Sequence, residues 1–158
     1  MKVVFLDIDG VLNSMDYYEK TRDKGAYGIN PNKVKLLKEI IERTGAEIIL
    51  SSTWRCLGRT SEEEHPMYTY LVEALAQFGL EIKEHTPMIN NNRPEEIKAW
   101  LDNQAEREIK FISLDDDFVK DKYEKYGIGE CLVRTSFYEP DGGLRREHVE
   151  MAVEILNG

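Results

Sequence analysis

Two carboxylates follow the first apolar segment of the sequence at a spacing that suits metal and phosphate chemistry. The run at residues 3–6 is typical of a buried strand, and Asp7, Asp9 and Gly10 follow it. Carboxylates this close raise each other's pKa unless a cation lies between them. The pair therefore indicates either a shared proton or a divalent cation. We favour the cation, because Gly10 lets the backbone turn sharply and bring Asp9 and its carbonyl towards Asp7. The alternative is a strand that ends in a polar turn, since Asp and Gly are common turn residues.

Two further apolar segments, at residues 47–50 and 109–114, also end in polar side chains. The residues that follow them are Ser51, Ser52, Arg55, Asp115, Asp116 and Asp117. The carboxyl ends of parallel strands share one edge of a sheet, where ligands bind in open α/β folds. We therefore expect these polar groups to converge with Asp7 and Asp9.

Strand and helix patterns alternate along the whole chain. We expect strands at 3–6, 47–50, 80–84, 109–114 and 131–133, and helices at 31–44, 67–78, 94–101, 118–126 and 144–156. This order predicts a single α/β domain over residues 1–158, a three-layer α/β/α Rossmann-like sandwich with a mainly parallel sheet. Residues 13 to about 30 read as an irregular flap. Its tyrosines, Tyr17, Tyr18 and Tyr27, could stack on a base or anchor the loop.

Composition limits the classes of function. The formal net charge of −9 opposes long-range attraction to nucleic acid, although a local basic groove remains compatible with it. Cys56 and Cys131 lie far apart without metal-ligand spacing, which favours a reduced, cytoplasmic setting. No stretch of 18 apolar residues occurs, so we expect neither secretion nor a membrane association. The sequence indicates no protein partner.

The order of these motifs resembles that of the haloacid dehalogenase-like hydrolases. The matching residues are Asp-x-Asp-Gly at 7–10, an apolar strand ending in Ser at 48–51, the basic Arg93, and an apolar strand ending in paired acids at 112–116. Within that superfamily, the chain is most similar to small bacterial and phage domains related to the phosphatase half of RNA-repair and polynucleotide kinase-phosphatase proteins. The segments that carry this similarity are FLDIDGVLN, IILSSTWR, NRPEEIKAWL and GLRREHVEMAVEIL. No stretch between the motifs is long enough for a large lid, so the cap is minimal or absent.

The resemblance implies catalytic roles for four residues. Asp7 would attack phosphorus and form an aspartyl-phosphate, and Asp9 would protonate the leaving alkoxide and then activate water. Members that cleave carbon–halogen bonds need no acid at the position of Asp9, so its presence favours phosphoryl transfer. Ser51 would donate a hydrogen bond to a phosphate oxygen, and Arg93 would balance its charge. The superfamily more often has Lys at that place, which leaves Lys83 and Lys110 as alternatives.

The resemblance also implies a Mg²⁺ site and a substrate-binding surface. Mg²⁺ would bind the Asp7 carboxylate, the Asp9 carbonyl and an acid of the fourth strand. We take Asp116 as the direct ligand and Asp115 as its neighbour, with the register open by one residue. Ser52 and Asn13 are further candidates for substrate binding. Arg55 would reach a phosphate, or else form a surface salt bridge.

These patterns predict a Mg²⁺-dependent phosphomonoesterase. A phosphorylated nucleic-acid end or a nucleotide is the first candidate substrate, because an open site admits bulky molecules. A small phosphorylated metabolite is the second candidate, since the net acidity disfavours nucleic acid. A non-catalytic domain that binds phosphorylated ends or a partner is a third reading, and the acid at Asp9 disfavours it.

Overall fold

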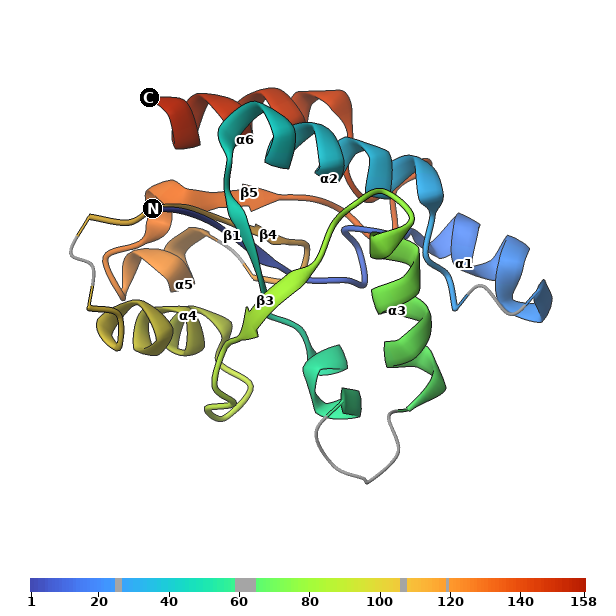
Figure 1. The fold of residues 1–158 in the computed structure, drawn as a ribbon, viewed down its shortest axis with the longest axis horizontal. Helices are drawn as coiled ribbons and strands as arrows, with labels where there is room; N and C mark the ends of the chain where they lie inside the picture. Colours follow the sequence, from blue (N-terminus) through green and yellow to red (C-terminus); the bar gives the residue numbers. More distant parts are fainter. Residues whose placement is uncertain (25–26, 59–64, 106–107, 119) are drawn as a thin grey trace.

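A parallel five-stranded sheet forms the centre of the molecule in the computed structural model, which describes residues 1–24, 27–58, 65–105, 108–118 and 120–158 (Figure 1). The strand order is β3-β2-β1-β4-β5. The strands are β1 (Lys2–Leu6), β2 (Glu47–Leu50), β3 (Ile82–His85), β4 (Lys110–Asp115) and β5 (Leu132–Arg134). Each neighbouring pair is parallel. The predicted three-layer α/β/α Rossmann-like fold is therefore confirmed.

Helices cover both faces of the sheet (Figure 1). The first face packs against α2 (Pro31–Thr44), α3 (Pro66–Ala76) and α6 (Arg146–Asn157). The second face packs against α4 (Arg93–Asp102) and α5 (Lys120–Glu124). No helix among the described residues is both long enough and apolar enough to cross a membrane.

The central strand β1 contributes to two separate cores. Val4 and Leu6 belong to the cluster under α2, α3 and α6, whereas Val3 and Phe5 belong to the cluster under α4 and α5. This division follows from the strand period of two, which points successive side chains to opposite faces. The Phe5 ring meets the Trp100 ring edge to face, with 5.3 Å between the centroids. Burial on both faces explains why the strand reads as a continuous apolar run.

The observed bounds of α2 equal the predicted range, and the ends of the other predicted helices differ from their ranges by one or two residues. Asn30 caps α2 by accepting a hydrogen bond from the Asn32 N–H, and Gly45 ends the helix in the left-handed conformation. The last helix begins at Arg146, so the prediction that Leu144 lies within it was wrong. Three short 3₁₀ helices, η1 (Arg22–Lys24), η2 (Thr53–Gly58) and η3 (Gly129–Cys131), were not expected.

The segment predicted to be irregular contains a helix, α1 (Met15–Thr21). Ser14 caps it by accepting a hydrogen bond from the Tyr17 N–H, and Asp16 supplies a negative charge in the first turn. Thr21 is the only buried residue of α1. The prediction was wrong because a helix without a buried apolar stripe gives no periodic hydrophobic signal.

The turn after β1 brings two segments that are distant in sequence into close approach. Gly10 has a φ of +81°, and a Cβ atom there would lie 2.2 Å from the Asp116 carboxyl carbon. The Thr135 hydroxyl also donates a hydrogen bond to the Gly10 carbonyl, at 2.5 Å. The turn is therefore packed against the ends of β4 and β5, and a side chain at residue 10 would displace Asp116.

We expect Gly10→Ala to weaken divalent-metal binding and Gly45→Ala to leave it unchanged. Gly45 also has a positive φ, +73°, but nothing lies within 4 Å of a Cβ built there. Both variants should lose about 1–2 kcal/mol of unfolding free energy in urea, the cost of a left-handed non-glycine residue. Only Gly10→Ala should lower Mg²⁺ affinity in calorimetric titration, by about tenfold or more. Equal affinities in the two variants would contradict the close approach to Asp116.

Candidate active site

The carboxyl edge of the sheet sets polar side chains in one row. Leu6 pairs with Leu50 of β2 and with Leu114 of β4, so Ser51, Asp7 and Asp115 each lie one residue beyond a paired leucine. The hydrogen-bond ladder continues into this row, since the Ser51 N–H donates to the Leu6 carbonyl at 2.8 Å and the Asp7 N–H to the Leu114 carbonyl at 3.1 Å. By the period of two, the row continues the face that α4 covers.

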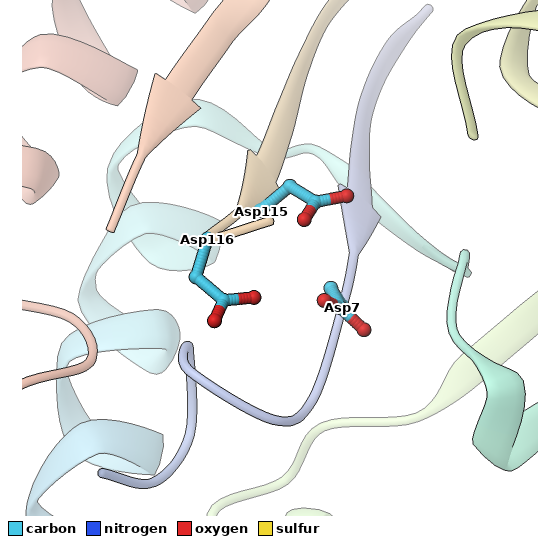
Figure 2. Close-up of side chains that lie close together, drawn as sticks. All are labelled: Asp7, Asp115 and Asp116. Atoms are coloured by element: carbon cyan, nitrogen blue, oxygen red, sulfur yellow. The ribbon is translucent and has the colours of Figure 1, made fainter. Parts of the chain in front are cut away.

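Three carboxylates meet at this edge. Oxygen atoms of Asp7, Asp115 and Asp116 all lie within 4.8 Å of one another, and Figure 2 shows the three side chains together at the ends of β1 and β4. Asp7 and Asp115 are buried, and Asp116 is half-buried. The two acids at the end of β4 therefore both offer an oxygen to the same point. Asp115 and Asp116 are thus both candidate ligands, and the choice between them stays open.

Burial raises the pKa values of all three acids, and repulsion from Asp115 adds to the rise for Asp7 and Asp116. Burial contributes most to the raised pKa of Asp7, and the Asp115 carboxylate adds to it. Burial likewise raises the pKa of Asp115, against the opposing effect of Arg93. Asp116 has its pKa raised to about 6, by burial first and by Asp115 second. The cluster therefore carries more negative charge near neutral pH than its surroundings stabilise.

Arg93, the first residue of α4, is the basic group that contacts this cluster. Its Nε lies 3.2 Å from an Asp115 oxygen, and its Nη2 lies 3.8 Å from an Asp7 oxygen. Burial opposes the charged form of Arg93, but the neighbouring carboxylates outweigh it and raise its pKa. Of the two alternatives, Lys83 pairs with Glu81 and Lys110 bonds the Gly158 carbonyl near the opposite end of β4. The structure therefore favours Arg93 among the three candidates.

Glu96 connects two arginines behind the cluster, and the sequence reasoning missed this. One of its oxygens lies 2.6 Å from Nη2 of Arg55, and the other lies 3.4 Å from Nη1 of Arg93. The Arg55-bound oxygen also accepts a hydrogen bond from the Ile89 N–H, at 2.8 Å. Glu96 is 1% exposed. The available signal was the spacing of three residues from Arg93, which places both side chains on one side of a helix.

Asp9 lies outside the buried cluster, with its carboxylate exposed and fixed from two sides. The Asn13 side-chain amide donates to one oxygen at 2.9 Å, and the Trp54 indole N–H donates to the other at 3.1 Å. The side-chain oxygen of Asn13, Oδ1, in turn accepts a hydrogen bond from the Gly10 N–H. Trp54 is buried, as a core residue would be, but its polar edge orients Asp9. Sequence alone could not reveal this second role.

Three residues predicted to bind substrate make contacts within the protein in this structure, and their substrate contacts stay predictions. Asn13 is fully buried and holds the turn and Asp9, as described above. Ser52 is 1% exposed, and its hydroxyl accepts a hydrogen bond from the Trp54 N–H. Arg55 forms an ion pair with Glu96 in the interior rather than at the surface, and its phosphate contact stays a prediction. Short polar side chains after a strand commonly bond nearby backbone, which explains Ser52 and Asn13.

Ser51 lies beside Asp7 in the edge row and is also nearly covered. Its hydroxyl accepts a hydrogen bond from the Thr86 hydroxyl at 3.4 Å, a long distance for such a bond. Thr86 continues the row beyond Ser51, because its N–H donates to the Leu50 carbonyl. The phosphate contact assigned to Ser51 stays a prediction.

The donor set of the cluster fits a hard divalent cation. Carboxylate oxygens are the ligands that Mg²⁺ prefers in proteins, and Mg²⁺ takes only a few of them while keeping several waters. A cation at this point would also compensate the charge of these buried carboxylates and relieve the repulsion from Asp115 that contributes to the raised pKa values of Asp7 and Asp116. Asp7, Asp115 and Asp116 are therefore the residues that would hold it.

One protein family matches almost the whole chain. The profile described as "HAD domain in Swiss Army Knife RNA repair proteins" matches residues 3–149, a range that includes every residue of the site. No curated protein and no solved structure matches the chain at a significant level.

We expect metal-free protein to lose stability at neutral pH because of Asp116. Folded Asp116 binds its proton up to a pH of about 6, whereas an unfolded Asp releases it at about 4. Between these values the folded state holds more protons, so the contribution of Asp116 to stability is present below about pH 4 and is lost as the pH rises through about 6. The unfolding free energy of wild type relative to Asp116→Asn should therefore fall from about pH 5 to about pH 7.

Chemical unfolding in urea at each pH, with a chelator present, measures this difference. Millimolar Mg²⁺ at neutral pH should restore the stability of wild type and leave Asp116→Asn nearly unchanged. A difference that is flat across this pH range would contradict the assigned environment of Asp116.

We also expect Glu96→Gln to destabilise the protein strongly. The change leaves Arg55 and Arg93 buried with one compensating charge fewer, and breaking a buried ion pair in this way costs about 3–5 kcal/mol. Glu95→Gln is the matched control, because Glu95 is the adjacent, partly exposed acid and its carboxylate accepts a hydrogen bond from the Asn92 side-chain amide. Its effect should stay within about 0.5 kcal/mol in urea unfolding. Similar losses of unfolding free energy in both variants would contradict the role of Glu96 as the buried counter-charge of Arg55 and Arg93.

Proposed function

This chain belongs to the family of HAD domains in Swiss Army Knife RNA repair proteins, and on that premise we propose that it is a Mg²⁺-dependent phosphomonoesterase for phosphorylated nucleic-acid ends. The observation that carries the proposal is the cluster of Asp7, Asp115 and Asp116 at the carboxyl edge of the sheet. Such a cluster is costly to a folded protein unless it binds a cation, which points to function as the reason for its presence.

Asp7 is the proposed nucleophile. One oxygen of its carboxylate would attack phosphorus, forming a new O–P bond as the bond between phosphorus and the leaving oxygen breaks. The backbone N–H of Ile8 donates a hydrogen bond to Oδ1 of the Asp7 carboxylate, at 2.9 Å, and this bond orients the carboxylate. Forming the aspartyl-phosphate divides one difficult hydrolysis into two easier displacements.

Asp9 is the proposed acid and base. It would give its proton to the leaving oxygen in the first step and take a proton from water in the second, as that water attacks the aspartyl-phosphate. The products are an alcohol and inorganic phosphate, and both carboxylates return to their starting state. The bonds from Asn13 and Trp54 support this role because they hold both oxygens of Asp9 while leaving the carboxyl group exposed.

Positive charge is needed at the phosphoryl group during both steps. Mg²⁺, when bound by the cluster, would neutralise phosphate charge and hold the phosphate against Asp7. Arg93 is placed between Asp7 and Asp115 and would stabilise the charge that spreads over the transferring group. Ser51, next to Asp7 in the edge row, accepts from Thr86, so its own hydroxyl hydrogen would be available to donate to a phosphate oxygen.

The family description favours a nucleic-acid end as the substrate, and the charge of the chain keeps a second candidate open. A net charge of −9 disfavours non-specific attraction to phosphate backbones, so a small phosphorylated metabolite is the second candidate. A panel of 3′- and 5′-phosphorylated oligonucleotides, nucleotides and sugar phosphates at fixed salt separates the two. Faster release of phosphate from sugar phosphates than from oligonucleotides would reverse the ranking.

We expect Asp7→Asn to abolish phosphate release and Asp9→Asn to affect substrates unequally. Removing a general acid costs about 10²–10⁴-fold for an alkyl phosphate, whose leaving oxygen needs a proton. An activated aryl phosphate, such as 4-nitrophenyl phosphate, has a stable leaving anion and should lose much less in its first step. Release of inorganic phosphate with and without Mg²⁺ measures each rate.

Asp121→Asn is the control, because Asp121 is an exposed acid in the first turn of α5. It should keep wild-type activity. Activity that survives Asp7→Asn, or that needs no divalent metal, would reject the proposed function. An equal loss on both substrates in Asp9→Asn would remove Asp9 from the acid role.

A further inference from the structure

A cavity with mainly aromatic walls opens beside Asp9. Its volume is about 600 Å³. Its lining includes Asp9 and four aromatic side chains, Tyr18, Tyr27, Trp54 and Phe137. Tyr18 lies on α1, Trp54 lies in η2, and Phe137 follows β5. Segments that are distant in the sequence therefore surround the one exposed carboxylate of the site.

The aromatic side chains of this cavity are held in place by the fold. Tyr18 packs on Gly28, where a Cβ atom would lie 2.8 Å from the ring. Tyr27 meets the ring of Tyr70 on α3 edge to face, with 5.4 Å between the centroids. The Trp54 indole bonds Asp9. The cavity is thus largely formed before any ligand binds, which lowers the entropic cost of binding.

A second cavity of about 540 Å³ lies on the Asp116 side of the site and differs in character. Its lining includes Asp116, Arg134, Arg145 and His148, so it is strongly charged. Phe137 lines both cavities, whereas Asp9 lines the aromatic one and is absent from the lining of the charged one. The site is therefore bordered by two chemically different cavities, a charged one beside Asp116 and an aromatic one beside Asp9.

We propose that the aromatic cavity binds the base of the nucleoside that leaves when the phosphate is removed. This inference rests on the proposed function, because it takes Asp9 as the acid. The acid must contact the leaving oxygen, so the group attached to that oxygen extends from Asp9 into the space beside it. That space is the aromatic cavity.

A nucleobase matches this lining better than an aliphatic group does. Tyr18 and Tyr27 are 44% and 36% exposed, so a planar ligand could cover ring faces that now contact water. Stacking on aromatic side chains tolerates any base, because every base has a flat π-surface. Arg22, which also lines the cavity, brings a positive charge towards an otherwise acidic protein and suits a nucleotide ligand.

Tryptophan fluorescence of the Asp7→Asn protein with Mg²⁺ tests the proposal without turnover. One ligand is a nucleoside 3′-monophosphate, and the other is the 3-phosphate of methyl ribofuranoside, which keeps sugar and phosphate but lacks the base. Trp54 lines the cavity and should respond, whereas Trp100 lies in the other core and gives a constant background. We expect saturable quenching by the nucleotide, with an affinity about tenfold or more above that of the abasic ligand.

Substitutions test whether the tyrosine rings cause the preference for the nucleotide over the abasic ligand. In the same Asp7→Asn background, Tyr18→Leu should remove most of the preference for the nucleotide, and Tyr18→Phe should keep it, because stacking needs the ring and not the hydroxyl. Tyr27→Leu is a second, independent variant in case Tyr18→Leu fails to fold, which circular dichroism detects. Tyr138→Leu is the matched control, because Tyr138 is 78% exposed and lines the charged cavity but not the aromatic one, which it adjoins through an edge-to-face contact with Phe137.

The outcomes separate this proposal from the proposed function. Equal affinity for the nucleotide and the abasic ligand would overturn the base-binding cavity, as would an equal loss of preference in Tyr18→Leu and Tyr138→Leu. Absence of Mg²⁺-dependent phosphate release from every substrate of the panel would instead overturn the phosphatase. A nucleotide preference lost in Tyr18→Leu would support the cavity in either case.

Discussion

Repulsion among three carboxylates at one point is the constraint on which this structure depends. Asp7, Asp115 and Asp116 lie within reach of a single ion, and two of them are buried. Moving a carboxylate out of water costs on the order of several kcal/mol unless an opposite charge compensates for it. The chain answers with Arg93 against Asp7 and Asp115, and with Glu96 between Arg93 and Arg55. The site is therefore one charge network that extends from the sheet edge into the interior.

The parallel sheet explains why these groups meet. Pairing of Leu6 with both Leu50 and Leu114 fixes the register, and a shift by one residue would turn every following side chain to the opposite face. In the observed register, Val3 and Phe5 face α4, and Asp7 continues that alternation. Because Arg93 is the first residue of α4, the same packing that buries Phe5 against Trp100 brings Arg93 to the carboxylates.

Sequence reasoning succeeded where a signal was local or periodic. The apolar runs predicted the central strands, and the helix expected at residues 31–44 has the bounds of α2. The convergence of the acids after β1 and β4 followed from the rule that parallel strands share an edge. Helix α1 escaped prediction because it buries almost none of its surface, so its hydrophobic pattern carries no period.

The sequence did not show which polar residues support the site and which contact a ligand. Whether Asn13 or Arg55 faces a ligand or the interior depends on tertiary packing, and a polar residue after a strand is compatible with both. Glu95 and Glu96 are both acids near the N-terminus of α4, and only the fold distinguishes the buried acid from its neighbour. Trp54 is buried, and the hydrogen bond from its indole N–H to Asp9 depends on a turn that is distant in sequence.

The charge of the whole network provides a further argument for a divalent ion. When all groups are ionised, the carboxylates of Asp7, Asp115, Asp116 and Glu96 exceed the guanidinium groups of Arg55 and Arg93 by two negative charges. One Mg²⁺ would make this network neutral. A phosphate dianion would then approach a neutral site, whereas without the ion it would meet two uncompensated charges in a poorly solvated place. The proposed attack by a carboxylate on a phosphate anion needs this neutralisation, so an ion bound here would stabilise the fold at neutral pH and would also permit the reaction.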